Sequence, residues 1–241
     1  MRPRRRTAGR VVVACAALFT ACSRPPEPTA TATSGAGPDA SAVRYLALGD
    51  SFTIGTGSEP SQSFPSRLAQ RWGASGCDVA LKNLGVNGYT TEDVIDAELP
   101  EIAPFAPTFV TLAVGANDIV HRESAETYRA HVRRILTAVI AAGVHADRIV
   151  ALSQPEWSLS PAATAFGDVA TLGRSIVAFN AVLQEEATAA GARFVDLSLV
   201  MHREGLLRMV AGDGLHPSAA AYDEWSVELS RAVPAPCGAP R

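Results

Sequence analysis

The chain has 241 residues, of which 47% are hydrophobic and 19% are charged, and its formal net charge at pH 7 is −3. Five arginines lie within the first ten residues, so the net charge without them falls from −3 to −8. This acidic balance argues against binding to nucleic acid and against electrostatic docking on anionic lipid.

The first 21 residues predict a signal peptide. The arginine-rich start precedes an apolar run, Val11–Ala21, that is too short to cross a bilayer as a mature helix. The segment LFTAC, residues 18–22, resembles a bacterial lipoprotein signal, in which Cys22 becomes the lipidated first residue. Ordinary secretion with cleavage nearby is the alternative. Both interpretations predict an exported protein, and in the lipoprotein interpretation it contacts the membrane only through the N-terminal lipid anchor.

Residues 22–42 predict a disordered tether. They are rich in Pro, Ala, Thr, Ser and Gly and contain no large apolar side chain, so they cannot bury enough surface to offset their chain entropy. Residues 43–241 then have the length of one domain.

Short apolar runs alternate with helical patterns along this domain. A stripe at helical spacing runs from Tyr128 to Ile140 and Gly143 follows it, a second long helix covers residues 169–190, and Ser218 can cap a last helix. A further helix start is expected at residues 90–93. The alternation predicts a parallel sheet with helices on both faces. The expected strands cover residues 43–49, 78–83, 108–115, 148–153 and 192–197.

Two cysteines remain after export. If Cys15 leaves with the signal and Cys22 carries lipid, Cys77 and Cys237 are left in an oxidising compartment, where they can form a disulfide. In a flavodoxin-like strand order both would lie at the amino-terminal edge of the sheet. Two unpaired thiols are the alternative. No clustered His/Cys spacing is present in the sequence, so we expect no metal site.

Polar turns follow the expected strands. Ligands of open parallel sheets bind beyond the carboxyl ends of the strands, so turns from distant parts of the chain should converge at one edge. These turns are Gly49–Ser51, Asn83–Thr91, Val114–Asp118 and Asp213–Ser218.

The residues in these turns suit acyl transfer to water. Ser51 is a candidate nucleophile, His216 can take its proton, and Asp213 can orient the imidazole. The oxyanion needs fixed donors, for which the candidates are the backbone N–H groups of Ser51 and Gly88 and the Asn117 amide. Taken singly, Ser51 is better explained as a helix cap, while Asn117 can form an Asx-turn and His216 can be a solvated loop residue.

Four sequence blocks together resemble the SGNH-hydrolase, or GDSL-esterase, family. They are GDSFTIG with Ser51, NLGVNGYTT with Gly88, GAND with Asn117, and DGLHPS with Asp213 and His216. They occur in family order and span almost the whole domain. Gly85 lies in the second block too; we choose Gly88 because it directly precedes the helix start. The resemblance implies a flavodoxin-like three-layer α/β/α sandwich with a five-stranded parallel sheet, and ester hydrolysis without a metal or another cofactor.

Two other classes of function are alternatives. The fold can also hold a flavin through phosphate contacts, but a flavin-binding module leaves the pair Asp213 and His216 unexplained. A surface lipoprotein that keeps the catalytic residues without turnover is the other alternative. Apart from His216, the histidines give weaker signals. His131 lies among arginines and is expected on a solvated helix face. His121 closely follows the third block, and a position that does not border the substrate is favoured over one that does.

The substrate is the least determined feature. Trp157, Leu159 and Phe166 follow the fourth strand, where they either line an acyl pocket or pack the loop onto the body. No long apolar lid is present in the sequence, which favours a small or medium ester, including lysophospholipid-like esters, over bulk lipid. Deacetylation of carbohydrate by the same residues is the runner-up. We expect a monomer whose partner is a small-molecule ester.

Overall fold

The computed structural model describes residues 42–237, so the predicted signal peptide, Cys22 and nearly all of the predicted tether lie outside the described residues. Five parallel strands form one sheet in the spatial order β2-β1-β3-β4-β5. This is the flavodoxin-like order, and it confirms the predicted fold class. The strands are β1 (Val43–Gly49), β2 (Val79–Asn83), β3 (Phe109–Ala113), β4 (Ile149–Leu152) and β5 (Arg193–Val195).

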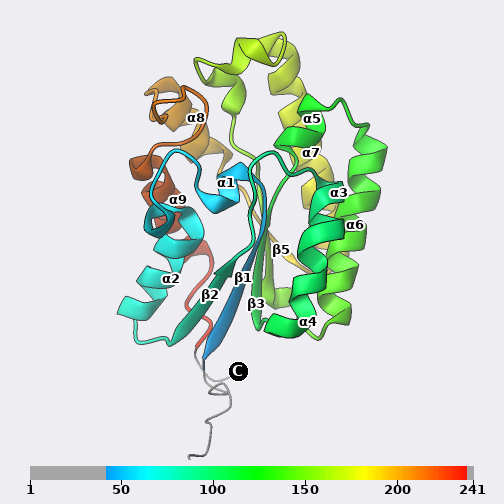
Figure 1. Cartoon of the computed structure of the whole chain (residues 1–241), viewed down its shortest axis with the longest axis vertical. Coiled ribbons are helices and arrows are strands. Elements are labelled where there is room, and N and C mark those ends of the chain that lie inside the picture. Colours follow the sequence, from blue (N-terminus) through cyan, green and yellow to red (C-terminus); the bar gives the residue numbers. More distant parts are fainter. Residues whose placement is uncertain (1–41, 238–241) are drawn as a thin grey trace, which may run out of the picture. The chain divides into compact units, whose positions relative to one another are not determined.

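Helices cover both faces of the sheet (Figure 1). On one face α2 (Phe64–Ala74) packs against α9 (Ala219–Ala232), with α8 (Ser198–Leu206) beside them. The other face carries α6 (Ala125–Ala141), which packs against α7 (Val169–Ala189), and the shorter α3 (Thr91–Asp93) and α4 (Ile102–Phe105). Two short helices, α1 (Ser51–Ile54) and α5 (Ala116–Val120), begin just beyond the carboxyl ends of β1 and β3.

Burial follows the position of each strand in the sheet. β3 and β4 are buried along their whole length and β1 along nearly all of it, because helices cover both of their faces. The edge strands β2 and β5 are only partly buried. This explains why the central strands have nearly continuous apolar sequences. None of the helices within residues 42–237 combines the length and apolar character of a membrane-spanning segment.

The predicted helices begin and end close to the expected residues. Ser124, Asp168 and Ser218 cap α6, α7 and α9 by accepting a backbone N–H three residues later. In α6 the predicted stripe is buried except for Ile140, which is 37% exposed. At 3.6 residues per turn Ile140 lies about 100° from the centre of the buried stripe, which explains why it is exposed.

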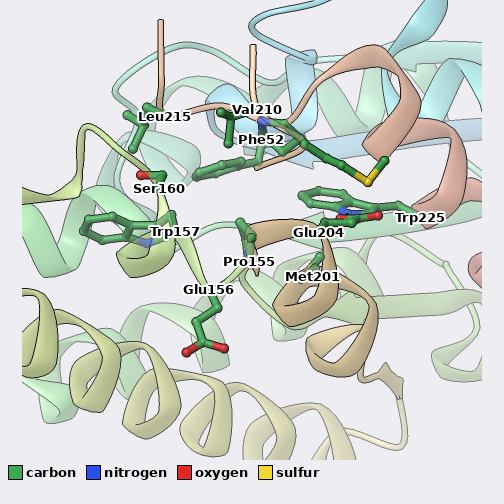
Figure 2. Close-up of a pocket in the computed structure, with 13 residues that line it drawn as sticks. Phe52, Pro155, Glu156, Trp157, Ser160, Met201, Glu204, Val210, Leu215 and Trp225 are labelled. Carbon is green, nitrogen blue, oxygen red and sulfur yellow. The ribbon is translucent and has the colours of Figure 1, made fainter. Parts of the chain in front are cut away.

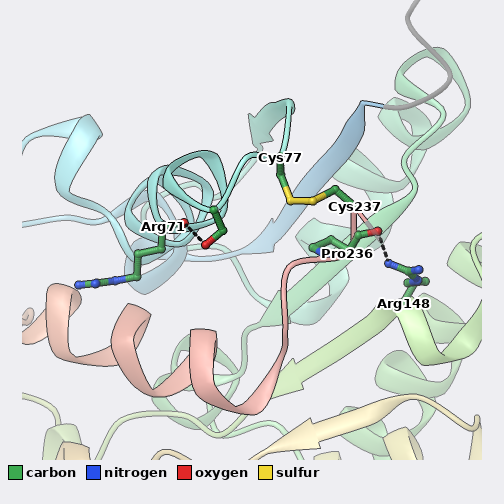
Figure 3. The surroundings of a disulfide bond; sticks show 6 residues. Arg71, Cys77, Arg148, Pro236 and Cys237 are labelled. Carbon is green, nitrogen blue, oxygen red and sulfur yellow. Dashed lines mark hydrogen bonds between the residues drawn. A yellow bond between two sulfur atoms is a disulfide. The ribbon is translucent and has the colours of Figure 1, made fainter. Parts of the chain in front are cut away.

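The structure joins Cys77 and Cys237 in a disulfide that links segments 160 residues apart (Figure 3). Cys77 precedes β2, and Cys237 follows α9. Arg148, just before β4, donates a 2.9 Å hydrogen bond to the carbonyl of Pro236, which neighbours Cys237. The disulfide therefore lies at the amino-terminal edge of the sheet, as predicted, and links the segment after the last helix to the segment before β2.

Candidate active site

Ser51 lies where β1 turns into α1. The turn requires Gly49, which has a φ of 148° and whose position leaves no room for a side chain, since a Cβ would lie 2.0 Å from the Ala113 carbonyl oxygen. Asp50 caps α1, with Oδ1 accepting a 2.9 Å hydrogen bond from the backbone N–H of Phe52. Ser51 is thereby fixed as the first residue of α1 and is 6% exposed.

Asp213 and His216 form a hydrogen-bonded pair in the turn before α9. The His216 ring Nδ1 lies 2.6 Å from Oδ2 of Asp213, and the other carboxylate oxygen accepts the backbone N–H groups of Leu215 and His216. Burial opposes ionisation, but the hydrogen bonds from Leu215 and His216 outweigh it and lower the pKa of Asp213. Because the ionised carboxylate can only accept, Nδ1 donates, and Nε2 of His216 is left as a potential base.

One pocket brings the predicted residues together. Ser51, Gly88, Asn117 and His216 all line it, and its walls surround about 540 Å³ of space, part of which is open to solvent. The ring of Phe52, which follows Ser51, lies 5.3 Å from the His216 ring, centroid to centroid. Within residues 42–237 no hydrogen bond joins the Ser51 hydroxyl to His216. In free enzymes such bonds are often long and shorten only when substrate binds.

The candidate oxyanion donors are linked to each other. Asn117, in α5, donates a 2.9 Å hydrogen bond from its side-chain nitrogen to the carbonyl of Tyr89, the residue after Gly88. The second amide hydrogen of Asn117 remains for a ligand in the pocket. Gly85 differs from Gly88, because its backbone N–H already donates to Asn83 and a Cβ there would meet Ile54.

His131 is not on a solvated face, so this prediction was wrong. Its Nδ1 lies 2.9 Å from the hydroxyl of buried Thr91, and that hydroxyl donates to the buried carboxylate of Asp118. The backbone N–H of Thr91 also donates to Asp118, at 3.0 Å. Burial raises the pKa of Asp118, against the opposing effect of these bonds. The network ties the segment that follows Gly88 to α5 and α6. The helical pattern alone could not reveal it, because the partners come from distant segments.

Two further buried carboxyl groups lie beneath the nucleophile. Burial raises the pKa of Asp50 to about 7, and the nearby charge of Asp118 adds to this. Burial also raises the pKa of Glu98 to about 9, although its Oε2 accepts the backbone N–H of Gly49 at 2.9 Å. Nothing in the sequence around Glu98 distinguished it from a surface residue. Within residues 42–237, no three His, Cys, Asp or Glu side chains are grouped as a metal site would require.

The loop after β4 forms the apolar side of the pocket. Trp157 is buried and Phe166 is 41% exposed, and both line the pocket together with Val120. Leu159 does not line it and instead lies next to Gly205 in α8. These three side chains were expected either to line the pocket or to pack the loop onto the body. Trp157 and Phe166 line the pocket, and Leu159 packs the loop onto the body. His121 is exposed and does not line the pocket.

Comparisons with known proteins identify the family and the fold of the chain. The model of the GDSL-like lipase/acylhydrolase family matches residues 47–224. The search of curated proteins gave no significant match.

Several solved structures share the fold. A lipase/acylhydrolase from Enterococcus faecalis has 24% identity and a TM-score of 0.64, over 79% of this chain and 94% of that one. An esterase from Pseudoalteromonas sp., solved with monoethylphosphonate as inhibitor, has 17% identity and a TM-score of 0.63, over 78% and 93%. A variant of an acetyl xylan esterase from Geobacillus stearothermophilus has 18% identity and a TM-score of 0.62, over 78% and 93%.

Proposed function

The chain belongs to the GDSL-like lipase/acylhydrolase family and is a carboxylic ester hydrolase, and we propose that it cleaves short- to medium-chain acyl esters through Ser51, His216 and Asp213. One observation carries the proposal. Ser51 lines the same pocket as His216, and Nδ1 of His216 lies 2.6 Å from Oδ2 of the ionised Asp213 carboxylate.

The reaction proceeds through an acyl-enzyme. The Ser51 oxygen attacks the ester carbonyl carbon while Nε2 of His216 takes the hydroxyl proton. His216 gives this proton to the leaving alcohol as the C–O bond breaks. A water molecule then loses a proton to His216 and attacks the acyl carbon. As the bond from this carbon to the Ser51 oxygen breaks, His216 returns the proton to that oxygen, the acid leaves, and the Ser51 hydroxyl is restored. Asp213 keeps Nδ1 protonated and stabilises the imidazolium in both steps.

Three donors would hold the negative oxygen of each tetrahedral intermediate. They are the backbone N–H groups of Ser51 and Gly88 and the Asn117 side chain. The shared pocket and the bond from Asn117 to Tyr89 support this assignment, because they keep the donors in a fixed relation before substrate arrives. Such preorganised donors lower the barrier without rearrangement during the reaction.

The walls of the pocket support an ester with a modest acyl group. Ala116, Val120, Trp157 and Phe166 supply an apolar surface, while His216 must face the leaving oxygen. The acyl chain would therefore lie against the apolar wall, and the alcohol would lie on the His216 side.

A specific feature favours carbohydrate O-acetyl esters as the second candidate. An open groove adjoins the pocket at Asn87 and is lined by the polar side chains of Thr56 and Ser58. Neutral hydroxyl and amide groups suit a hydroxylated alcohol such as a sugar. Parallel assays on an acetylated oligosaccharide and on p-nitrophenyl esters would distinguish the two candidates.

Steady-state kinetics test the assigned roles. Ser51→Ala and His216→Ala should abolish hydrolysis of p-nitrophenyl acetate while the circular dichroism spectrum and thermal unfolding stay those of the wild type. Ser61→Ala, an exposed serine of the neighbouring loop, is the matched control and should keep full activity. Turnover by folded Ser51→Ala at the wild-type rate would refute the assignment.

We also propose that the protein is exported and anchored through a lipidated Cys22. The arginine-rich start, the following apolar run and LFTAC support export, as does the disulfide, which persists in oxidising compartments. Labelling of cells with a fatty-acid analogue should mark the wild type and not Cys22→Ser. Equal labelling of both would exclude Cys22 as the lipidated residue.

A further inference from the structure

A second pocket, whose lining is drawn in Figure 2, adjoins the active-site pocket. Its walls, formed by the loop after β4, α8 and α9, surround about 350 Å³ of space, part of which is open to solvent. Its lining is mostly apolar, with Glu156, Ser160 and Glu204 as the polar members, and includes two methionines, whose flexible side chains adapt to ligands of different shape. The apolar lining residues on the side away from Ser51 are Pro155, Met201, Met209, Val210, Pro217 and Trp225.

Three side chains line both pockets and therefore separate them: Phe52, Trp157 and Leu215. Figure 2 shows all three among the residues that line the second pocket. An acyl chain that follows the apolar wall of the active-site pocket reaches this partition at Trp157. The position of this partition, more than the volume of the active-site pocket, then decides how long an acyl chain the site accepts.

Of the three, Trp157 is the one that is independent of the catalytic turn. The Phe52 ring packs on His216, and the backbone N–H of Leu215 donates to Asp213, so a change in either would disturb the catalytic residues. The indole N–H of Trp157 is buried and makes no hydrogen bond within residues 42–237. Its ring contacts the half-exposed ring of Phe166 edge-on, at 5.8 Å between centroids. No polar interaction of the described residues therefore holds the indole in place.

We propose that the second pocket is the binding site for the distal part of longer acyl chains, and that Trp157 is the gate that closes it. The proposal rests on the proposed ester hydrolysis. With the indole in its present position the enzyme processes acyl groups that end at the partition. When the indole turns away or is removed, the two pockets join, and further methylenes are buried among the methionines, Val210 and Trp225.

Acyl-chain selectivity measures this directly. Each methylene moved from water into apolar surroundings is worth about fourfold in kcat/KM. Hydrolysis of p-nitrophenyl acetate, butyrate and octanoate would be compared for the wild type and Trp157→Ala. We expect the ratio of kcat/KM for octanoate to that for acetate to rise at least tenfold in Trp157→Ala.

Two further variants identify the cause of such a rise. Leu159→Ala removes a side chain from the same loop that lines neither pocket, so it should leave the ratio unchanged. Met209→Phe, combined with Trp157→Ala, fills the second pocket and should cancel the gain. An undiminished gain in the double variant would show that the chain lies elsewhere and would overturn the proposal.

The remaining outcomes are also decisive. An unchanged ratio in a folded Trp157→Ala that still hydrolyses acetate would overturn the gate. If that variant does not fold, Trp157→Leu replaces it, with the same expected direction and the same refuting result. Failure of the wild type to hydrolyse any of the esters would instead refute the proposed function, so the two failures are distinguishable.

Discussion

Removal of the Asp118 carboxylate should lower both stability and turnover, although we assign it no contact with substrate. In Asp118→Ala the backbone N–H and the hydroxyl of buried Thr91 lose their acceptor. A buried donor without a partner costs about 1–3 kcal/mol, and relief from burying a carboxylate offsets part of this. We expect the free energy of unfolding to fall by about 2–4 kcal/mol.

The effect on turnover follows from the neighbours of this network. Thr91 is three residues after Gly88, and Asp118 is next to Asn117. Loss of the hydrogen bonds between Thr91 and Asp118 therefore displaces both oxyanion donors. A misplacement of about 1 Å costs on the order of 10² in rate. Because Asn117 keeps its bond to Tyr89, we expect kcat to fall by about 10- to 100-fold, with KM nearly unchanged.

The assay combines thermal unfolding with steady-state kinetics on p-nitrophenyl acetate below the unfolding temperature. Thr91→Val, which removes only the hydroxyl, should change kcat in the same direction by a smaller factor. Asp168→Ala is the matched control. It removes an exposed carboxylate that caps α7, so it should leave kcat unaltered. A folded Asp118→Ala with wild-type kcat would refute the positioning role of the network.

Three further results are expected. Asn117→Ala should lower kcat by about 10²–10³ with little change in KM, because it removes a donor to the oxyanion; steady-state kinetics measure this, and an unchanged kcat would exclude the donor. Replacing Cys77 and Cys237 by serine should lower the free energy of unfolding by about 2–5 kcal/mol in a denaturant titration, with kcat retained, because the bond lies at the opposite edge of the sheet from Ser51. Glu98 holds a proton in the folded protein up to about pH 9 and in the unfolded chain only up to about 4.5, so stability should fall as pH rises between these values. Glu98→Gln keeps an acceptor for Gly49 and should weaken this pH dependence in thermal unfolding, and identical curves would contradict the burial argument.

Features with a local cause were predictable from the sequence. The central strands have nearly continuous apolar runs because both of their faces are covered, and α9 begins at Ser218 because a serine side chain can accept an N–H of the first turn. Parallel strands end at one edge, so the turns with Ser51 and His216 were expected to meet without knowledge of the loops. The structure brings both residues to one pocket.

Features that depend on tertiary contacts were not predictable. His131 has arginine neighbours in its helix and looks solvated, yet its ring bonds to Thr91 from a segment 40 residues earlier. Glu98 is buried because the helical segment before β3 passes beneath Gly49. The sequence alone left open whether the side chains of the loop after β4 face the pocket, because a loop without periodicity does not fix their direction.

The central claim is that the Ser51 oxygen becomes a nucleophile because His216 takes its proton. Its most direct test is mass spectrometry of the protein after incubation with a fluorophosphonate, followed by peptide mapping. We predict one adduct, located on Ser51 in the wild type and strongly slowed in His216→Ala. An adduct on a different residue, or equally fast labelling without the imidazole, would contradict the account.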